Sequence, residues 1–133
     1  MKALTVKQPW ADAIAHGAKR TENRTWTTRY RGPLLIHAAV SEDRHAILPA
    51  GQNTARADWP DYRAAIIATA ELADIHFADG CCTPWGEPDV YHWQLAGVYA
   101  LPEPVLTKGR LQLWTPAPAI IHAALDQVEE DAS

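Results

Sequence analysis

Ten residues near the start of the sequence have the types and spacing to bind an anionic or aromatic ligand. Residues 17–26 read Gly-Ala-Lys-Arg-Thr-Glu-Asn-Arg-Thr-Trp. On a strand the side chains divide between two faces, with Arg20, Glu22, Arg24 and Trp26 on one and Thr21, Asn23 and Thr25 on the other. An acid between two guanidinium groups, followed by an indole, can hold a phosphate and stack a base. The same residues also suit a solvent-exposed strand with ordinary ion pairs.

The elements that must position these residues are mostly strands. We expect strands over 4–6, about 20–26, 34–39, 64–76, 90–101 and 111–114. Helices are expected over 9–16, around 46–48 after the capping sequence 41–43, and over 119–125. Segments 51–62 and 77–89 read as an exposed excursion and a turn-rich loop, and the six residues 34–39 read as a strand buried on both sides. This pattern predicts an α+β fold, a small mixed β-barrel with short helices at its ends.

Length and composition indicate one globular domain. The chain has 133 residues and is 47% hydrophobic, which suits a domain over 1–125 followed by an acidic, flexible tail over 126–133. No apolar run approaches the roughly 20 residues of a membrane-spanning helix, and the N-terminus lacks a signal-peptide pattern. We therefore expect a cytoplasmic protein with no membrane partner.

Charge is distributed unevenly along the chain. Residues 1–37 contain seven cations and two acids, whereas residues 38–133 contain five cations and fourteen acids, and the net charge is −4. A locally basic face on an acidic body is typical of a selective site for an anionic ligand. Folding can also mix the two halves and remove the asymmetry.

The two cysteines, Cys81 and Cys82, are adjacent. Adjacency disfavours an ordinary structural disulfide between them and is consistent with a reducing compartment. Both thiols can join a metal site with His76 or His92, but the spacing matches no common zinc pattern. We therefore expect no metal and no cofactor.

Several segments together resemble the ASCH domain (activating-signal-cointegrator homology) of the PUA-like superfamily. They are Leu-Thr-Val-Lys-Gln-Pro-Trp at 4–10, Gly17-x-Lys19-x-x-Glu22-x-Arg24, Tyr-Arg-Gly-Pro-Leu-Leu-Ile-His-Ala at 30–38, and Lys-Gly-x-Leu-x-Leu-Trp at 108–114. The resemblance covers about residues 3–116. It implies a PUA-like barrel that binds RNA or a modified nucleoside or nucleotide in a cleft beside the Lys-Glu-Arg strand.

The residues available for such binding supply charge, stacking and base readout. We expect Lys19 and Arg24 to contact a phosphate or base carbonyl, and Glu22 to orient them or accept from an amine. The other candidates around this basic cleft are Arg31, Trp26, Trp85, Trp93 and the loop 77–89. Trp10 is expected in the core.

Two catalytic functions and one non-catalytic function remain open. Some ASCH proteins hydrolyse N4-acetylcytidine, and such an amidohydrolase would use Lys19 with Thr21 or Glu22, and Glu71 or Asp74 as a remote carboxylate. On a strand, however, Thr21 faces away from Glu22. A ribonuclease would need an acid–base group such as His37, His76 or His92, of which His37 suits a core position better. The non-catalytic alternative is a structural or adaptor protein, in which the ion-paired strand binds no ligand and only forms part of the barrel.

Overall fold

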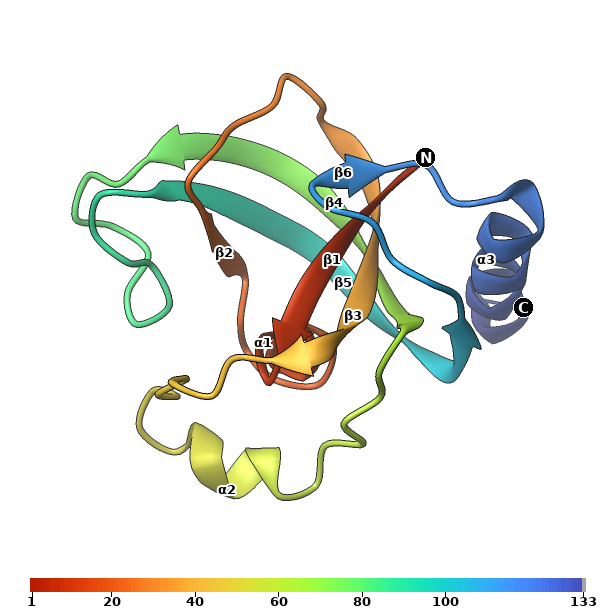
Figure 1. The fold of residues 1–133 in the computed structure, drawn as a ribbon, viewed down its shortest axis with the longest axis horizontal. Coiled ribbons are helices and arrows are strands. Elements are labelled where there is room, and N and C mark those ends of the chain that lie inside the picture. Colours follow the sequence, from red (N-terminus) through yellow and green to blue (C-terminus); the bar gives the residue numbers. More distant parts are fainter. Residues whose placement is uncertain (133) are drawn as a thin grey trace.

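The computed structural model describes residues 1–132, with side chains to residue 130. The strands are β1 (Lys2–Gln8), β2 (Thr21–Arg24), β3 (Gly32–Glu42), β4 (Ala65–Phe77), β5 (Tyr91–Leu106) and β6 (Leu113–Trp114). The helices are α1 (Trp10–Ala15), α2 (Gln52–Arg56) and α3 (Pro118–Ala132). One six-stranded sheet has the order β2-β5-β4-β3-β1-β6 and curls around the core as a half-barrel (Figure 1). The expected α+β barrel-like fold is confirmed.

Curling brings the two ends of the sheet toward each other. β1 and β3 are parallel, and the other neighbouring strands are antiparallel. β2 and β1 are not neighbours in the sheet, yet the Arg24 Nη2 of β2 donates to the Thr5 carbonyl of β1 at 2.8 Å. A side chain therefore bridges the opening of the half-barrel.

The core consists of two clusters, one on each face of the central strands. The cluster inside the curl includes Leu4, Ile14, Leu34, Leu72 and Trp93. The other lies under α3 and includes Ala3, Leu35, Ile66, Leu101, Trp114 and Ala124. All six residues of β3 from 34 to 39 are buried, as expected for a strand covered on both faces. Each fully buried large apolar side chain stabilises the fold by about 1.5–3 kcal/mol.

Helix α1 ends where the sequence predicts. The Gly17 amide donates to the Ala13 carbonyl at 3.1 Å. A Cβ on Gly17 would lie 2.9 Å from the Trp59 ring, so a larger residue would displace that ring. The Arg20 guanidinium donates to the Ile14 carbonyl at 3.1 Å, which satisfies one carbonyl in the last turn of the helix, and to the Lys19 carbonyl beyond the helix at 2.9 Å.

The prediction of a helix around 46–48 is wrong. β3 continues to Glu42, which pairs with Gln8, and so the segment 41–42 is strand. The Asp43 carboxylate accepts from the His45 amide at 3.0 Å and stabilises a turn in place of a helix cap. The only helix between β3 and β4 in the described chain is α2, inside the segment expected to be irregular.

Strand β5 extends past its two prolines to Leu106. β2 pairs only with residues 91–94 of β5, and the register of β5 with β4 skips residues 101–104, so Pro102 and Pro104 fall in an irregularity of the sheet. A proline is tolerated there because its missing amide has no ladder partner.

The C-terminal helix is longer than the expected 119–125. α3 continues to Ala132, so the acidic segment 126–132 is helical, while Ser133 lies outside the described residues. The Gln127 side chain accepts from the Glu103 amide at 2.9 Å and donates to its carbonyl at 3.0 Å, which joins this part of the helix to β5. Among the described residues, no helix is long and apolar enough to cross a membrane.

The adjacent cysteines are bonded to each other, contrary to the expectation that their adjacency disfavours a disulfide. Cys82 has a φ of 73°, in the left-handed region. This backbone conformation turns the two neighbouring side chains toward the same side of the loop.

Candidate functional site

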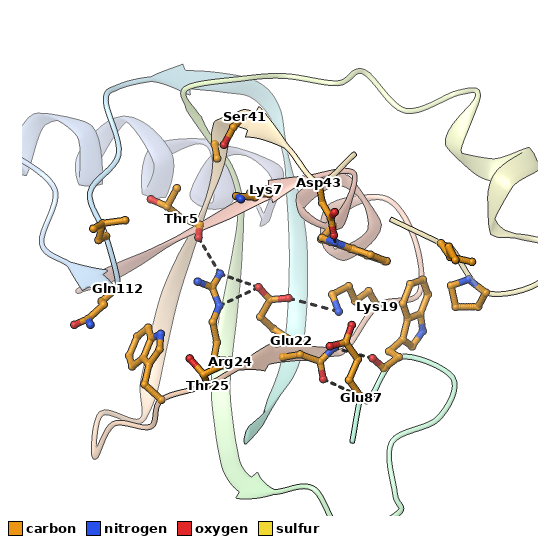
Figure 2. Close-up of a pocket in the computed structure, with 18 of the residues that line it drawn as sticks. Thr5, Lys7, Lys19, Glu22, Arg24, Thr25, Ser41, Asp43, Glu87 and Gln112 are labelled. Carbon is orange, nitrogen blue, oxygen red and sulfur yellow. Dashed lines mark hydrogen bonds and ion pairs between the residues drawn. The ribbon is translucent and has the colours of Figure 1, made fainter. Parts of the chain in front are cut away.

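A cleft of about 750 Å³ opens between β1, β2 and three connecting segments. Its floor is formed by Lys19, Glu22 and Arg24 (Figure 2). Other residues that line the cleft come from the β3–α2 connection, from the loop 78–90 between β4 and β5, and from the segment before β6, namely Leu111 and Gln112. Pockets that take small organic ligands have volumes of roughly 300–1,000 Å³. The cleft is therefore large enough for a nucleobase.

Glu22 lies at the centre of the floor. Its Oε2 accepts from Arg24 Nε at 3.1 Å and Nη2 at 2.8 Å, and its Oε1 lies 3.5 Å from Lys19 Nζ. Glu22 and Lys19 are only 6% and 2% exposed. A single buried carboxylate thus neutralises part of the charge of two cations.

These contacts leave defined groups free for a ligand. Lys19 Nζ also donates to the Thr21 carbonyl at 2.5 Å, so two of its three N–H groups are used within the protein. Arg24 uses Nε and Nη2, whereas its Nη1 has no hydrogen bond within the described chain. Glu22 Oε1 keeps acceptor capacity beside Lys19, whereas Arg24 Nη1 lies on the side of the guanidinium that faces away from the carboxylate, because Nε and Nη2 make the contacts with Glu22.

Burial lowers the pKa of Lys19 from its usual 10.5, because the folded protein desolvates the ammonium group. The nearby Glu22 carboxylate acts in the opposite direction and favours the charged form. Two indoles complete the surroundings, with the Trp10 and Trp85 rings centred 5.2 and 5.5 Å from Nζ. Such cation–π contacts partly replace the lost hydration.

Trp10 and Trp85 form the aromatic corner of the cleft. Their ring centroids are 6.5 Å apart and the rings are perpendicular at 88°, so they meet edge to face. Trp10 Nε1 donates to Asp43 Oδ2 at 3.0 Å, which fixes the ring and lowers the pKa of that carboxyl. The expectation that Trp10 lies in the core is correct only in part: its ring packs against the core cluster, but it is only partly buried and also lines the cleft.

The loop that carries Trp85 is held by β2. Asn23 Nδ2 donates to the Trp85 carbonyl at 2.9 Å, and the Glu87 amide donates to Asn23 Oδ1 at 2.9 Å. Pro84, Trp85 and Glu87 line the cleft, so the segment 77–89 forms a wall as the sequence indicates.

The other predicted ligand residues have different positions. Trp26 lines the cleft and its ring packs at 4.7 Å on that of Trp93. Trp93 is completely buried, so the prediction that it stacks a base is wrong. Arg31 is not among the lining residues; its guanidinium donates to the carbonyls of Thr28 and Tyr30, both at 2.9 Å. The curl of the sheet leaves Arg31 in the exposed turn before β3.

Thr21 lies on the opposite face of β2 from the cleft, as strand alternation predicts. Its hydroxyl donates to Gln94 Oε1 on β5 at 3.3 Å. Only its backbone carbonyl contacts Lys19. The Thr21 hydroxyl is therefore not positioned to act with Lys19.

The cleft is balanced in charge, so the sequence-based expectation of a basic cleft is corrected. The charged lining residues are the three cations Lys7, Lys19 and Arg24 and the three acids Glu22, Asp43 and Glu87. Asp43 and Glu87 come from the acidic part of the chain and fold onto the basic part. A neutral ligand surface fits this lining better than a row of phosphates.

None of the candidate histidines lines the cleft. His37 is buried, with Nδ1 3.2 Å from Thr5 Oγ1 and Nε2 2.7 Å from the Thr107 carbonyl, and burial lowers its pKa. His76 and His92 lie together behind the loop 78–90. Glu71 and Asp74, the proposed remote carboxylates, are exposed on β4 and are not lining residues either.

Sequence reasoning missed several contributors to the cleft, among them Thr5, Lys7, Trp10 and Asp43. Their sequence positions give one clue, because residues 4–10 form a conspicuous polar and aromatic segment beside a proline. Asp43 carries no such clue, since only the pairing of β3 with β1 brings it to Trp10.

Comparison with known proteins gives one family. The family model described as the ASCH domain matches residues 4–95. Human activating signal cointegrator 1 is 46% identical over 39 residues, which span 29% of this chain and 7% of that protein. The chain thus corresponds to a small part of this curated relative.

A solved structure supports the fold over nearly the full length. A crystal structure of a mutant of ZmASCH from Zymomonas mobilis aligns with a TM-score of 0.58 and 12% sequence identity, covering 94% of this chain and 96% of that one. At this level of identity the similarity concerns the fold.

Proposed function

Because the chain belongs to the ASCH domain family, whose members are linked to RNA binding, we propose that it binds RNA or a modified nucleotide by taking one base into the cleft. The observation that carries this proposal is the Lys19–Glu22–Arg24 set, in which Lys19 and Glu22 are buried and donors and an acceptor are still free, beside the Trp10–Trp85 corner. A base needs a flat apolar partner and a hydrogen-bonding edge, and this lining supplies both.

The base edge that fits best has a hydrogen-bond acceptor beside an N–H donor. Lys19 Nζ can donate one further hydrogen bond, and the neighbouring Glu22 Oε1 can accept one. Uracil has such a pair on both sides of its imide N–H, whereas cytosine has it only between its amine and N3. Uridine and base modifications that keep the imide are therefore the preferred ligands.

The affinity for short single-stranded RNA tests the proposal. Fluorescence anisotropy with labelled oligouridylate and oligocytidylate of equal length should show tighter binding of the former. Since the lining is balanced in charge, few phosphates are neutralised and affinity should fall only gently as salt rises. Equal affinity for both, with a steep salt dependence, would indicate nonspecific backbone binding and contradict the proposal.

Trp85→Ala tests the aromatic corner. Loss of a stacking partner removes about 1–3 kcal/mol per base, and so the dissociation constant should rise roughly 5- to 150-fold. Tyr62→Ala is the matched control, because Tyr62 is 38% exposed and does not line the cleft. If both variants bind like the unmodified protein, the base does not occupy this corner.

Hydrolysis of an acylated cytidine is the second candidate, favoured by the lowered pKa of Lys19 beside Glu22 in the cleft. Thr21 is excluded from such a mechanism by its position on the far face of β2, so the activity would depend on Lys19 and Glu22. Incubation with N4-acetylcytidine followed by chromatography distinguishes the two functions, since a pure binding domain releases no cytidine. A ribonuclease is disfavoured because neither histidine nor tyrosine lines the cleft within residues 1–132.

A further inference from the structure

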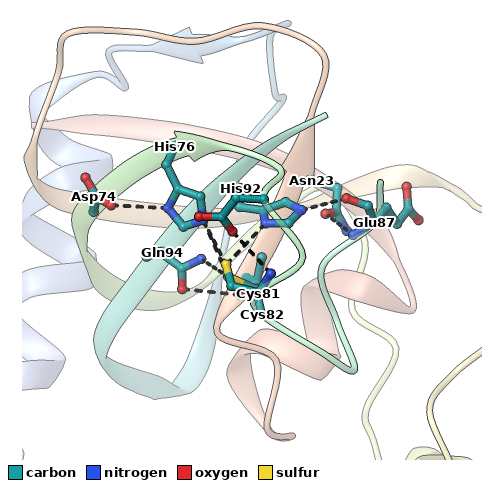
Figure 3. The surroundings of a disulfide bond; sticks show 10 residues. Asn23, Asp74, His76, Cys81, Cys82, Glu87, His92 and Gln94 are labelled. Atoms are coloured by element: carbon teal, nitrogen blue, oxygen red, sulfur yellow. Dashed lines mark hydrogen bonds and ion pairs between the residues drawn. A yellow bond between two sulfur atoms is a disulfide. The ribbon is translucent and has the colours of Figure 1, made fainter. Parts of the chain in front are cut away.

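Two histidines and two cysteines come together behind the loop 78–90 (Figure 3). His76 at the end of β4 pairs directly with His92 at the start of β5. The loop between these strands returns Cys81 and Cys82 to the same place. One ligand atom from each of the four residues lies within 4.8 Å of all the others.

The two histidine rings are oriented as metal ligands are. His76 Nδ1 lies 3.3 Å from Asp74 Oδ2, and its Nε2 points to the sulfurs, 3.0 Å from Cys81 Sγ and 3.5 Å from Cys82 Sγ. His92 has the reverse arrangement, with Nε2 2.6 Å from the Glu87 carbonyl and Nδ1 3.9 Å from Cys81 Sγ. Metal-binding histidines characteristically direct one nitrogen to the metal while the other donates to a carboxylate or a backbone carbonyl.

We propose that the reduced protein binds one Zn²⁺ ion through His76 Nε2, Cys81 Sγ, Cys82 Sγ and His92 Nδ1. Two imidazoles and two thiolates are the donors of structural tetrahedral zinc sites. Mg²⁺ and Ca²⁺ are disfavoured because they require oxygen ligands. Gln94 Nε2 donates to Cys82 Sγ at 3.0 Å, a contact that would stabilise the thiolate in the zinc complex.

The zinc-bound and disulfide states exclude each other. In the structure the two sulfurs are bonded to each other. A thiol or phosphine reductant supplies two electrons, and with two protons the disulfide becomes two thiols. Zinc then binds as both thiols release their protons, which makes the affinity dependent on pH as well as on redox state.

A zinc ion here would also stabilise one wall of the cleft. A Cβ on Gly86 would lie 2.8 Å from the His92 ring and 2.9 Å from Cys82 Cβ, so the loop packs tightly against the cluster at this point. Residues 84, 85 and 87 on the other side of the same turn line the cleft. Only this consequence depends on the proposed function, because the metal site itself needs no ligand in the cleft.

Cobalt titration of the full chain tests the site. In the presence of a phosphine reductant, Co²⁺ should bind in a ratio of one ion per chain. The spectrum should show thiolate-to-cobalt charge transfer in the near ultraviolet and the intense visible bands of tetrahedral Co²⁺, and Zn²⁺ should displace both. The same protein without reductant should give no charge-transfer band, because its sulfurs are bonded to each other.

Two variants localise the metal. Cys82→Ser should weaken the charge-transfer band by removing one sulfur ligand. Asp74→Ala changes an exposed side chain that contacts only His76 among the four ligands, so it leaves the fold intact while lowering metal affinity roughly 10- to 100-fold. Glu71→Ala is the matched control, an exposed carboxylate on the same strand whose removal should change nothing.

The proposal is overturned if the reduced protein shows no charge-transfer band, or if Cys82→Ser retains the whole band. Equal metal affinity of the Asp74→Ala and Glu71→Ala variants would likewise contradict the assigned role of Asp74. None of these results depends on RNA, so failure of nucleotide binding and failure of metal binding are separately visible.

Discussion

At the scale of single residues, Glu22 determines the character of the cleft. Its carboxylate contacts both Lys19 and Arg24, which would otherwise be two cations in a largely desolvated site. Removing one partner of a buried ion pair destabilises a protein by roughly 3–5 kcal/mol, because the other charge is left uncompensated. The three side chains therefore act as one unit, and variants should preserve the Glu22–Arg24 pair while they test Lys19.

Lys19→Met makes the stability of the protein depend differently on pH. The lowered pKa of Lys19 means that the unfolded chain binds this proton more tightly, so the free energy of unfolding rises with pH between the lowered pKa and 10.5. In Lys19→Met, the free energy of unfolding lacks this pH-dependent contribution. From neutral pH to about pH 11, the melting temperature of the unmodified protein should increase relative to that of Lys19→Met.

Circular dichroism melts at a series of pH values measure this difference. The control is Lys108→Met, since Lys108 is exposed and its removal should leave the pH trend of the unmodified protein in place. Parallel curves for Lys19→Met and the unmodified protein would show that Lys19 has an ordinary pKa.

At the scale of elements, the loop 78–90 connects two sites. Its inner side packs on His92 through Gly86, and its outer side presents Trp85 to the cleft. β2 holds the same loop through both hydrogen bonds of Asn23. The position of the aromatic wall therefore depends on a strand and on the cysteine–histidine cluster together.

Asn23→Ala should release the loop without changing the cleft floor. Two hydrogen bonds of about 1 kcal/mol each are lost, and RNA affinity should fall roughly 5- to 30-fold. Hydrogen exchange at the Glu87 amide, whose acceptor is Asn23 Oδ1, should accelerate.

Thr27→Ala is the matched control, because Thr27 is exposed on the same segment and does not line the cleft. It should alter neither exchange nor affinity. Unchanged protection of the Glu87 amide in Asn23→Ala would mean that the loop is held by its own turns.

At the scale of the whole molecule, the second core cluster and the cleft lie on different faces of the sheet. α3 covers the second core cluster and contributes no residue to the cleft (Figure 1). The cleft opens where the sheet curls, between β1 and β2. A change under α3 should thus affect folding and leave recognition intact.

Ala124→Ser tests this separation. Ala124 is completely buried, and an unsatisfied hydroxyl there should destabilise the protein by about 1–3 kcal/mol, a fall in melting temperature of at least roughly 3 °C. RNA affinity measured well below the melting temperature should not change. Ala123→Ser, on the exposed side of the same helix, should melt like the unmodified protein. A loss of affinity in Ala124→Ser would show that the two faces are coupled.

The sequence by itself determined most strands, the end of α1 near Gly17 and the presence of Lys19, Glu22 and Arg24 in one short segment. These features follow from local physics: strand alternation places Glu22 and Arg24 on one face and Thr21 on the other, and a run of apolar residues such as 34–39 requires burial on both sides. The ends of β3, β5 and α3 were misjudged because pairing with neighbouring strands and packing on the core extend an element past its local signals.

Only the tertiary structure decided what surrounds those residues. The curl of the sheet brings Trp10 and Trp85 over Lys19, and the pairing of β3 with β1 brings Asp43 into a cleft that sequence alone suggested was basic. The register of β4 on β5 sets His76 opposite His92, and the loop adds two cysteines whose spacing resembles no common metal motif. Contacts between distant segments depend on register and curvature, which are properties of the whole sheet and are not encoded in the spacing of any one segment.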